Sequence, residues 1–264
     1  MKNDWTMDYN YHAHTYLCGH ATGTPEEYIQ RAIEGGIKYM GFSDHIPHVK
    51  KDGTESTYRV PYDKAKEYVD DICALRDKYR DQIEIKVGFE SEYYEDVFED
   101  MLNEAICFGG EYLIFGAHFL FASDTGYSLV PRDSVDFLNN YVCNVTKAIR
   151  SGVFNYDAHP DLVYFTGDTE IYREEMRKIC RASAECNIPL EINFLGIREN
   201  KIYPSDVFWQ IAGEEKSPVT FGFDSHSVEG ACDKTSLIKA KEMVEKFHLQ
   251  YIGKPKLIDI KKLK

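Results

Sequence analysis

The sequence predicts an α/β fold in which parallel strands close into a single barrel. Two observations support this prediction. Strand-like and helix-like segments alternate about seven times along the chain, and histidines and acids stand where the strand-like segments end. Such alternation indicates βαβ units and a parallel sheet, which is either closed or open and doubly wound. Only a closed barrel brings the ends of its first and last strands to one mouth, so the placement of these residues favours the barrel.

Runs rich in Val, Ile, Phe and Tyr predict the strands, and several runs are almost continuously apolar, as expected for strands covered on both faces. The predicted strands are Met7–His14, Tyr39–His45, Ile83–Tyr93, Tyr112–Leu120, Val153–His159, Pro189–Phe194 and Val219–Ser225.

Amphipathic segments between the strands predict the helices. These are Pro25–Gly35, Pro61–Tyr79, Phe98–Phe108, Ser134–Arg150, Asp168–Cys186, Pro204–Glu215 and Ser236–His248. The first follows a capping residue, Thr24, opens with a proline and two acids, and closes at a glycine pair. The polar connection Ile46–Tyr58 is expected to form a mobile flap over the site.

The composition predicts one soluble domain spanning residues 1–264. Of the 264 residues, 43% are hydrophobic and 28% are charged, which suits a large core under a polar surface. The net charge of −13 opposes general binding to nucleic acid or to anionic membranes. We therefore expect a small-molecule substrate, neither a nucleic-acid nor a membrane partner, and a monomer or small homo-oligomer.

A cytoplasmic location is expected. Met1–Thr6 contains no apolar stretch of signal-peptide length, and no window of the chain approaches the roughly 18 apolar residues of a membrane span. The seven cysteines are scattered and odd in number, with no Cys-x-x-Cys pair, which favours reduced thiols.

Histidines and carboxylates at the predicted strand ends point to a metal site. Seven of the nine histidines stand at or just after the end of a hydrophobic run, namely His12, His14, His20, His45, His118, His159 and His226. His12 and His14 lie two apart on one strand and so share a face, and Asp224 repeats this spacing with His226 on the last strand. A lone His-x-His pair is weak evidence, but further histidines at the other strand ends make chance a poor explanation.

Carboxylates on the third predicted strand are candidates to bridge two ions. Glu90 is preferred over Glu92, which shares its face, because Glu90 is nearer the end of the apolar run. Asp44 should point away from its neighbour His45 and orient a ligand instead.

Three other residues have weaker claims to the site. Cys18 is expected to be a packed neighbour rather than a ligand. His48 on the flap is either a substrate contact or a solvated side chain, and His248 is a surface residue.

In their order along the chain, these residues resemble the motifs of the polymerase-and-histidinol-phosphatase (PHP) family. The matching motifs are His12-Ala13-His14, His20, Ser43-Asp44-His45, Gly88-Phe89-Glu90, Gly116-Ala117-His118, Ala158-His159-Pro160-Asp161 and Phe223-Asp224-Ser225-His226. Farther along, Glu191-Ile192-Asn193, Gly196, Arg198 and Tyr203-Pro204-Ser205 resemble the histidinol-phosphate phosphatase branch of the family.

The resemblance implies a distorted (β/α)7 TIM-like barrel with three divalent metal ions at the C-terminal ends of the strands. Zinc is favoured, and manganese, iron or cobalt would also suit such ligands. The implied sets are His12, His14, Glu90 and Asp224 for one ion, Glu90, His118 and His159 for a second, and His20, His45 and His226 for the third. The flap start Ile46-Pro47-His48 and the pair Phe194-Leu195 depart from the family pattern and affect only the expected substrate contacts.

The implied activity is hydrolysis of L-histidinol phosphate to L-histidinol and phosphate, in histidine biosynthesis, by attack of a metal-bound hydroxide. Glu90 and Asp224 would act in catalysis through the metals. Arg198 is expected to clamp the phosphate, because a guanidinium binds two oxygens at once, although a surface arginine is the alternative. Asp161 would bind the substrate ammonium or protonate the leaving alkoxide, or it would only cap a turn.

Two other functions stay open at this point. One is a phosphoesterase of the same family that acts on a nucleotide or another small phosphate ester. The other is a non-catalytic metal-binding module.

Overall fold

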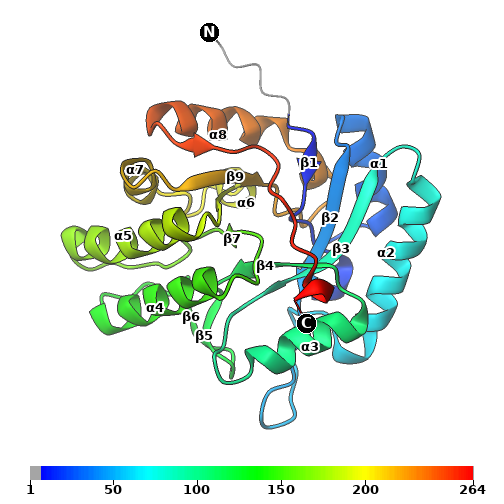
Figure 1. The fold of residues 1–264 in the computed structure, drawn as a ribbon, viewed down its shortest axis with the longest axis horizontal. Coiled ribbons are helices and arrows are strands. Elements are labelled where there is room, and N and C mark those ends of the chain that lie inside the picture. Colours follow the sequence, from blue (N-terminus) through cyan, green and yellow to red (C-terminus); the bar gives the residue numbers. More distant parts are fainter. Residues whose placement is uncertain (1–6, 264) are drawn as a thin grey trace.

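The computed structural model describes residues 7–263 and contains a curled parallel sheet with helices packed outside it (Figure 1). The eight strands of this sheet lie in the order β1-β2-β3-β4-β7-β8-β9-β10, and all neighbours are parallel. They are β1 (Tyr9–Asn10), β2 (Tyr39–His45), β3 (Glu84–Ser91), β4 (Tyr112–Gly116), β7 (Asp157–Ala158), β8 (Leu190–Asn193), β9 (Pro218–Gly222) and β10 (Gln250–Tyr251). The predicted α/β barrel class is confirmed.

Contacts at and beyond the ends of β1 and β9 bring these two strands together. Ala13 forms a parallel bridge with Ser225, in which the Ser225 N–H donates to His12 O at 3.1 Å and the His14 N–H donates to Ser225 O at 2.9 Å. Farther down, the Tyr9 hydroxyl lies 2.9 Å from Thr220 Oγ1. The barrel therefore closes at the end where the predicted ligands lie.

The main helices follow the predicted positions. They are α1 (Pro25–Gly35), α2 (Ala65–Tyr79), α3 (Phe98–Phe108), α4 (Val135–Ser151), α5 (Thr169–Cys186), α7 (Asp206–Glu214) and α8 (Lys234–Lys246). At α1, Thr24 and Glu27 form a reciprocal capping box, as the cap, proline and acids at its start suggested.

Several short elements were not predicted. They are α6 (Phe194–Arg198), the antiparallel hairpin of β5 (Phe119–Phe121) and β6 (Thr125–Tyr127), β10, and the 3-10 turns Tyr16–Cys18, Tyr62–Lys64, Glu229–Cys232 and Ile260–Lys262. The predicted strand 112–120 is therefore split, since it leaves the sheet after Gly116 and enters the hairpin at Phe119.

The two predicted strands 7–14 and 153–159 shorten most, to two residues each, where side-chain contacts and left-handed backbone replace the ladder. After Asn10 the chain leaves β1, and the His12 N–H donates to Asn10 Oδ1 instead of to a neighbouring strand. In the predicted strand 153–159, only Asp157 and Ala158 pair, and His159 has a φ of 39°. Both departures occur where ligand-type residues must turn into the barrel mouth.

The loop predicted as a flap does not lie over the metal-ligand cluster. Val49 and Glu55 form an antiparallel bridge, and the tip of the loop projects beside α3, at the bottom of Figure 1. This correction concerns the tip of the loop, because both of its ends lie next to the cluster: the Ile46 N–H donates to Glu90 O, and Tyr58 contacts His45.

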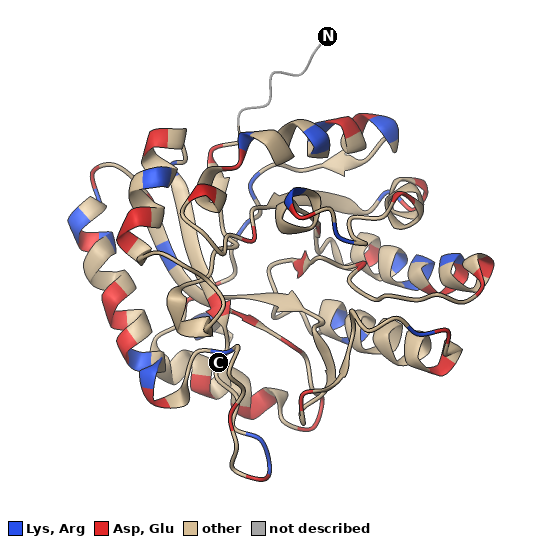
Figure 2. Ribbon diagram, turned by 180° about the vertical axis from the view of Figure 1, so that it is seen from behind, with Lys and Arg blue, Asp and Glu red and all other residues tan. Residues whose placement is uncertain are grey.

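Many of the Lys, Arg, Asp and Glu positions lie on the outer helices, where acidic and basic positions are interspersed (Figure 2). Among residues 7–263 the structure has no helix long and apolar enough to cross a membrane. Met1–Thr6, on which part of the expected cytoplasmic location rests, lies outside the described residues.

Candidate metal centre

All nine predicted metal ligands come together at the carboxyl ends of the barrel strands. His12 and His14 follow β1, His45 ends β2, and Glu90 lies near the end of β3. The others follow the remaining strands or turns: His20 after Tyr16–Cys18, His118 between β4 and β5, His159 after β7, and Asp224 and His226 after β9.

Four of these residues point buried polar atoms at one another without hydrogen-bond partners. The atoms are His12 Nε2, His14 Nε2, Asp224 Oδ1 and both carboxylate oxygens of Glu90. Each of the two Nε2 atoms lies 3.3–3.5 Å from Glu90 Oε2 and from Asp224 Oδ1. A tetrahedron with metal–ligand bonds of about 2.1 Å has edges of about 3.4 Å, so this spacing fits one divalent ion.

The two oxygens of Glu90 face different groups of histidines. Oε2 faces His12 and His14, whereas Oε1 lies 3.0 Å from His159 Nε2 and 3.5 Å from His118 Nε2. A carboxylate in this position can bridge two ions. Space for it is left by Gly116, where a Cβ would overlap Glu90 Oε1.

Glu92, the alternative candidate for the bridging carboxylate, lies behind His118 and not between the groups of histidines. It receives a hydrogen bond from Arg59 at 2.7 Å, and its Oε1 lies 3.4 Å from His118 Nδ1, the far side of that imidazole. Glu92 therefore orients His118, and Glu90 is the carboxylate at the centre.

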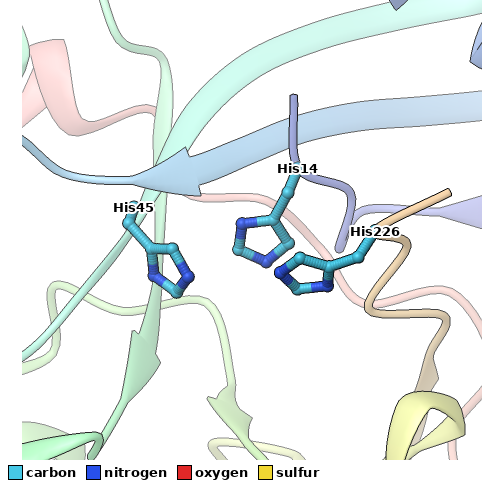
Figure 3. A group of neighbouring side chains, drawn as sticks. All are labelled: His14, His45 and His226. Atoms are coloured by element: carbon cyan, nitrogen blue, oxygen red, sulfur yellow. The ribbon is translucent and has the colours of Figure 1, made fainter. Parts of the chain in front are cut away.

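A third group of imidazoles lies beside the first. His20 Nε2 and His226 Nε2 are 3.0 Å apart, and the His20 and His45 ring centroids are 5.4 Å apart. The ring of His226 also stacks on His14, with centroids 4.1 Å apart, so His14, His45 and His226 point toward one another (Figure 3). Cys18 is buried behind this group, and its sulfur lies close enough to His20 and His226 to belong to a possible ligand group.

Further carboxylates hold the first two histidines in place. His12 Nδ1 lies 2.9 Å from Glu191 Oε2, and His14 Nδ1 lies 3.4 Å from Asp44 Oδ1. The other Asp44 oxygen accepts hydrogen bonds from the Thr15 backbone and hydroxyl. Such contacts to Nδ1 leave each Nε2 free for a metal. The predicted orienting role of Asp44 agrees with this geometry.

Burial and opposite charges strongly perturb the cluster. Burial lowers the pKa of His14, but the nearby carboxylates of Asp224, Asp44 and Glu90 raise it to about 9. The pKa of His45 lies well below its usual value because of burial and the nearby His14. Burial opposes ionisation of Glu90 and Asp224, yet the facing histidines hold both pKa values well below the usual range. Bound cations would stabilise these carboxylates in the same way.

Two of the grouped residues have left-handed backbone. The φ of His159 is 39° and that of Asp224 is 46°. Positive φ is uncommon for residues other than glycine and concentrates at functional sites. Here it turns both side chains into the barrel mouth directly after their strands end.

A family comparison agrees with this geometry. The PHP domain model matches residues 10–194, which is well over half of the chain. This chain belongs to the PHP domain family.

Relatives of this PHP domain include proteins named as histidinol phosphatases. The probable histidinol-phosphatase of Deinococcus radiodurans is 27% identical over 222 residues, covering 81% of this chain and 85% of that protein. The histidinol-phosphatase of Bacillus subtilis is 25% identical over 249 residues, covering 81% and 92%. A crystal structure of histidinol phosphate phosphatase from Lactococcus lactis, complexed with zinc, L-histidinol and phosphate, has a TM-score of 0.68 at 20% identity and covers 93% of this chain and 95% of that one. At that identity the structural likeness establishes the fold.

A cavity of about 540 Å³ opens onto the metal-ligand cluster of this PHP domain. Its floor includes Glu90 and Asp224 with five of the histidines, and its wall is formed by apolar and aromatic side chains. That wall includes Tyr58, Phe119, Tyr127, Leu129, Leu162, Leu195 and Tyr203. The size suits a small molecule.

Arg198, predicted to clamp phosphate, lies outside this cavity lining. Its guanidinium donates to Asp233 Oδ2 at 3.0 Å and to the backbone oxygens of Phe223 and Asp224 at 3.5 and 3.2 Å. Arg198 ends the short helix α6, which turns it toward the end of β9. This geometry ties Arg198 to the Asp224 segment, and its expected role as a phosphate clamp stays a prediction.

Two other predicted substrate contacts also face elsewhere. Asp161 is buried, and its Oδ2 accepts a hydrogen bond of 2.6 Å from the Ser205 N–H, so it holds the start of α7. Burial raises the Asp161 pKa to about 7. His48 Nε2 lies 2.7 Å from Ala122 O and lines a separate cavity beside the loop tip. Neither side chain lines the metal cavity.

The charged residues that do reach the cavity wall were not predicted. Glu199 and Lys201 both line it, with the Lys201 Nζ 3.0 Å from Glu199 Oε2. They follow α6, a helix that the sequence pattern did not reveal. The available signal was that Glu199 and Lys201 stand two residues apart in the segment that follows the predicted strand Pro189–Phe194.

Proposed function

We propose that this PHP domain is a metal-dependent phosphomonoesterase that hydrolyses L-histidinol phosphate to L-histidinol and phosphate, a step of histidine biosynthesis. The observation that carries the proposal is the set of buried, unpartnered ligand atoms of His12, His14, Glu90 and Asp224, of which Glu90 and Asp224 also line a cavity of small-molecule size. Two relatives named as histidinol phosphatases support the choice of substrate.

The proposed centre has three ions, with Glu90 shared between the first two. His12, His14, Glu90 and Asp224 would hold the first, Glu90, His118 and His159 the second, and His20, His45 and His226 the third. Divalent ions there would polarise the phosphoryl group and lower the pKa of an attacking water. The L. lactis structure was obtained with zinc, which supports zinc as the metal.

Residues outside the proposed ligand set would hold the ligands in the orientation that binds the ions. Glu191 and Asp44 hold the Nδ1 atoms of His12 and His14, so both Nε2 lone pairs face the centre. Asn193 donates to Glu191 and to Asp224 Oδ2 at 2.7 and 3.0 Å, which leaves Asp224 Oδ1 facing inward.

The cavity wall offers complementary groups for the rest of the substrate. Histidinol phosphate carries an ammonium and an imidazole besides its phosphate. Glu199, which is paired with Lys201 at 3.0 Å, would offer a carboxylate to the ammonium, and Tyr58 and Tyr127 would form part of an aromatic surface for the imidazole.

Phosphate release from L-histidinol phosphate, measured beside a panel of nucleoside monophosphates, tests the proposal. We expect a clear preference for histidinol phosphate, loss of activity on chelation, and recovery when zinc is added. Glu90→Gln should abolish turnover, whereas His248→Asn, at an exposed position in the left-handed conformation that asparagine tolerates, should leave it unchanged. Equal rates on all esters would refute the substrate assignment. Protein that retains its metal but hydrolyses none of the esters would refute the proposed phosphomonoesterase activity.

A further inference from the structure

An arginine outside the metal-ligand set is buried close to it. Arg59 follows the loop 46–58, and only 1% of its side chain is exposed. An arginine at this depth loses its hydration and must be compensated by fixed partners. Its partners are Glu92, Asp124 and the backbone oxygen of Ile46, at 2.7, 3.2 and 3.4 Å from the guanidinium nitrogens.

These partners come from three separate segments. Ile46 begins the loop that Arg59 closes, Glu92 follows β3, and Asp124 lies in the turn between β5 and β6. Arg59 therefore ties both ends of the loop and the turn of the β5–β6 hairpin to the end of one barrel strand. Backbone bonds reinforce this junction, because Val60 donates to His45 O and Ile46 donates to Glu90 O.

The junction extends to His118 through Glu92. One Glu92 oxygen accepts from Arg59, and the other lies 3.4 Å from His118 Nδ1. Burial disfavours the Glu92 carboxylate, but Arg59 and His118 hold its pKa at about 2, so it stays charged. The opposite nitrogen of His118 faces Glu90 at 3.5 Å. The His118 backbone is also tied to the hairpin side, since Ser128 N–H donates to its oxygen.

The same junction sets one wall of the cavity. Tyr58, next to Arg59, lines the cavity and stacks on Phe119 with ring centroids 5.2 Å apart and planes at 19°. Phe119 belongs to β5, the hairpin that Arg59 holds through Asp124. Moving Arg59 would therefore move the aromatic wall and His118 together.

We propose that Arg59 is a positioning residue that couples the seating of the 46–58 loop and the β5–β6 hairpin to the orientation of His118 through Glu92. Arg59 does not line the cavity and is not one of the proposed metal ligands. The part of this inference that concerns turnover rests on the proposed function, whereas the part that concerns metal retention and loop seating does not.

The test compares Arg59→Met with Arg76→Met, which breaks the part-exposed 2.9 Å pair between Arg76 of α2 and Glu111, away from the cluster. Metal content per chain is measured after dialysis against graded chelator, and trypsin cleavage at Lys50 and Lys51 reports loop seating. We expect Arg59→Met to weaken retention of one ion about 10- to 100-fold, the usual effect of losing a residue that orients a ligand. Loop cleavage should accelerate, and Arg76→Met should behave like the wild type.

Because Arg59→Met leaves Glu92 as an unpaired buried charge, the double variant Arg59→Met/Glu92→Gln removes both charges and decides the matter if the single variant does not fold. Folding is checked by circular dichroism. The folded double variant should still release one ion early and be cut faster, and Arg59→Lys should restore part of both properties. Wild-type metal retention and protease resistance in the double variant would overturn the proposal. These readouts need no substrate, so they stand apart from a failure of the phosphatase assignment.

Discussion

Gly116→Ala is expected to disable the metal centre while leaving the fold largely intact. Gly116 ends β4, and a Cβ on it would overlap Glu90 Oε1 and lie 2.8 Å from His118 Cε1 and 2.9 Å from Glu90 Cδ. Ordinary carbon contacts begin at about 3.4 Å, so the carboxylate carbon must retreat by about 0.5 Å and its oxygen by roughly 1 Å.

A shift of this size acts on the atom that faces His118 and His159. Misplacement of a reacting group by about 1 Å costs roughly 100-fold in rate, which corresponds to about 2.7 kcal/mol in the activation free energy. Overpacking costs about 1–3 kcal/mol in the free energy of unfolding. We therefore expect kcat/KM to fall at least about 100-fold, with a smaller loss of stability and a loss of bound metal.

The assay combines kcat/KM for histidinol phosphate, metal content per chain, and denaturant unfolding. Gly230→Ala is the matched control, because the new Cβ would meet Arg198 and Ser225 at an ordinary 3.4 Å. Full metal content in Gly116→Ala, with kcat/KM close to that of the wild type, would refute the packing argument around Glu90.

Three further outcomes are expected. Asp44→Asn should lower metal affinity about 10- to 100-fold by releasing the His14 ring, measured by competition with a chelating dye; unchanged affinity would contradict the orienting role. The folded-state pKa of Glu92 is about 2, below its usual 4.5, so its contribution of about 3 kcal/mol is present above pH 4.5 and is lost as the pH falls toward 2. Between pH 6 and pH 3, the free energy of unfolding measured with denaturant should therefore fall less in Glu92→Gln than in the wild type. An equal fall in both proteins would count against this contribution of Glu92. Stripping the metal should lower Tm, because an ion present at 100 times its Kd stabilises the folded state by about 2.7 kcal/mol; calorimetry with no shift would argue against a metal bound in the native state.

The sequence was sufficient to locate the cluster, because each ligand position can be recognised from the few residues around it. A ligand-type residue at the end of an apolar run has a known place in a parallel barrel, whatever the exact course of the strand. That is why His12 and Asp224 could be placed together although β1 is short and Asp224 takes a left-handed φ.

Substrate contacts could not be predicted in the same way, because they depend on how the chain continues after the strands. Asn193 accepts from the Gly196 N–H and starts α6, a helix of five residues. That single turn directs Arg198 toward the backbone of Asp224, whereas Glu199 and Lys201 reach the cavity. No hydrophobic period reveals so short a helix.

Charge balance explains why a protein of net charge −13 can offer a site to a phosphate ester. The ion-pair partners of Glu90, Glu191 and Asp224 are all histidines, and each of these acids is at most 3% exposed. Glu92, by contrast, has Arg59 as a permanent counter-charge. Buried carboxylates without a fixed cation are costly unless a proton or a metal ion accompanies them. Glu92 is thus balanced by a fixed arginine, whereas the burial and charge of Glu90 and Asp224 suit bound divalent cations, which would also make the cavity attractive to phosphate.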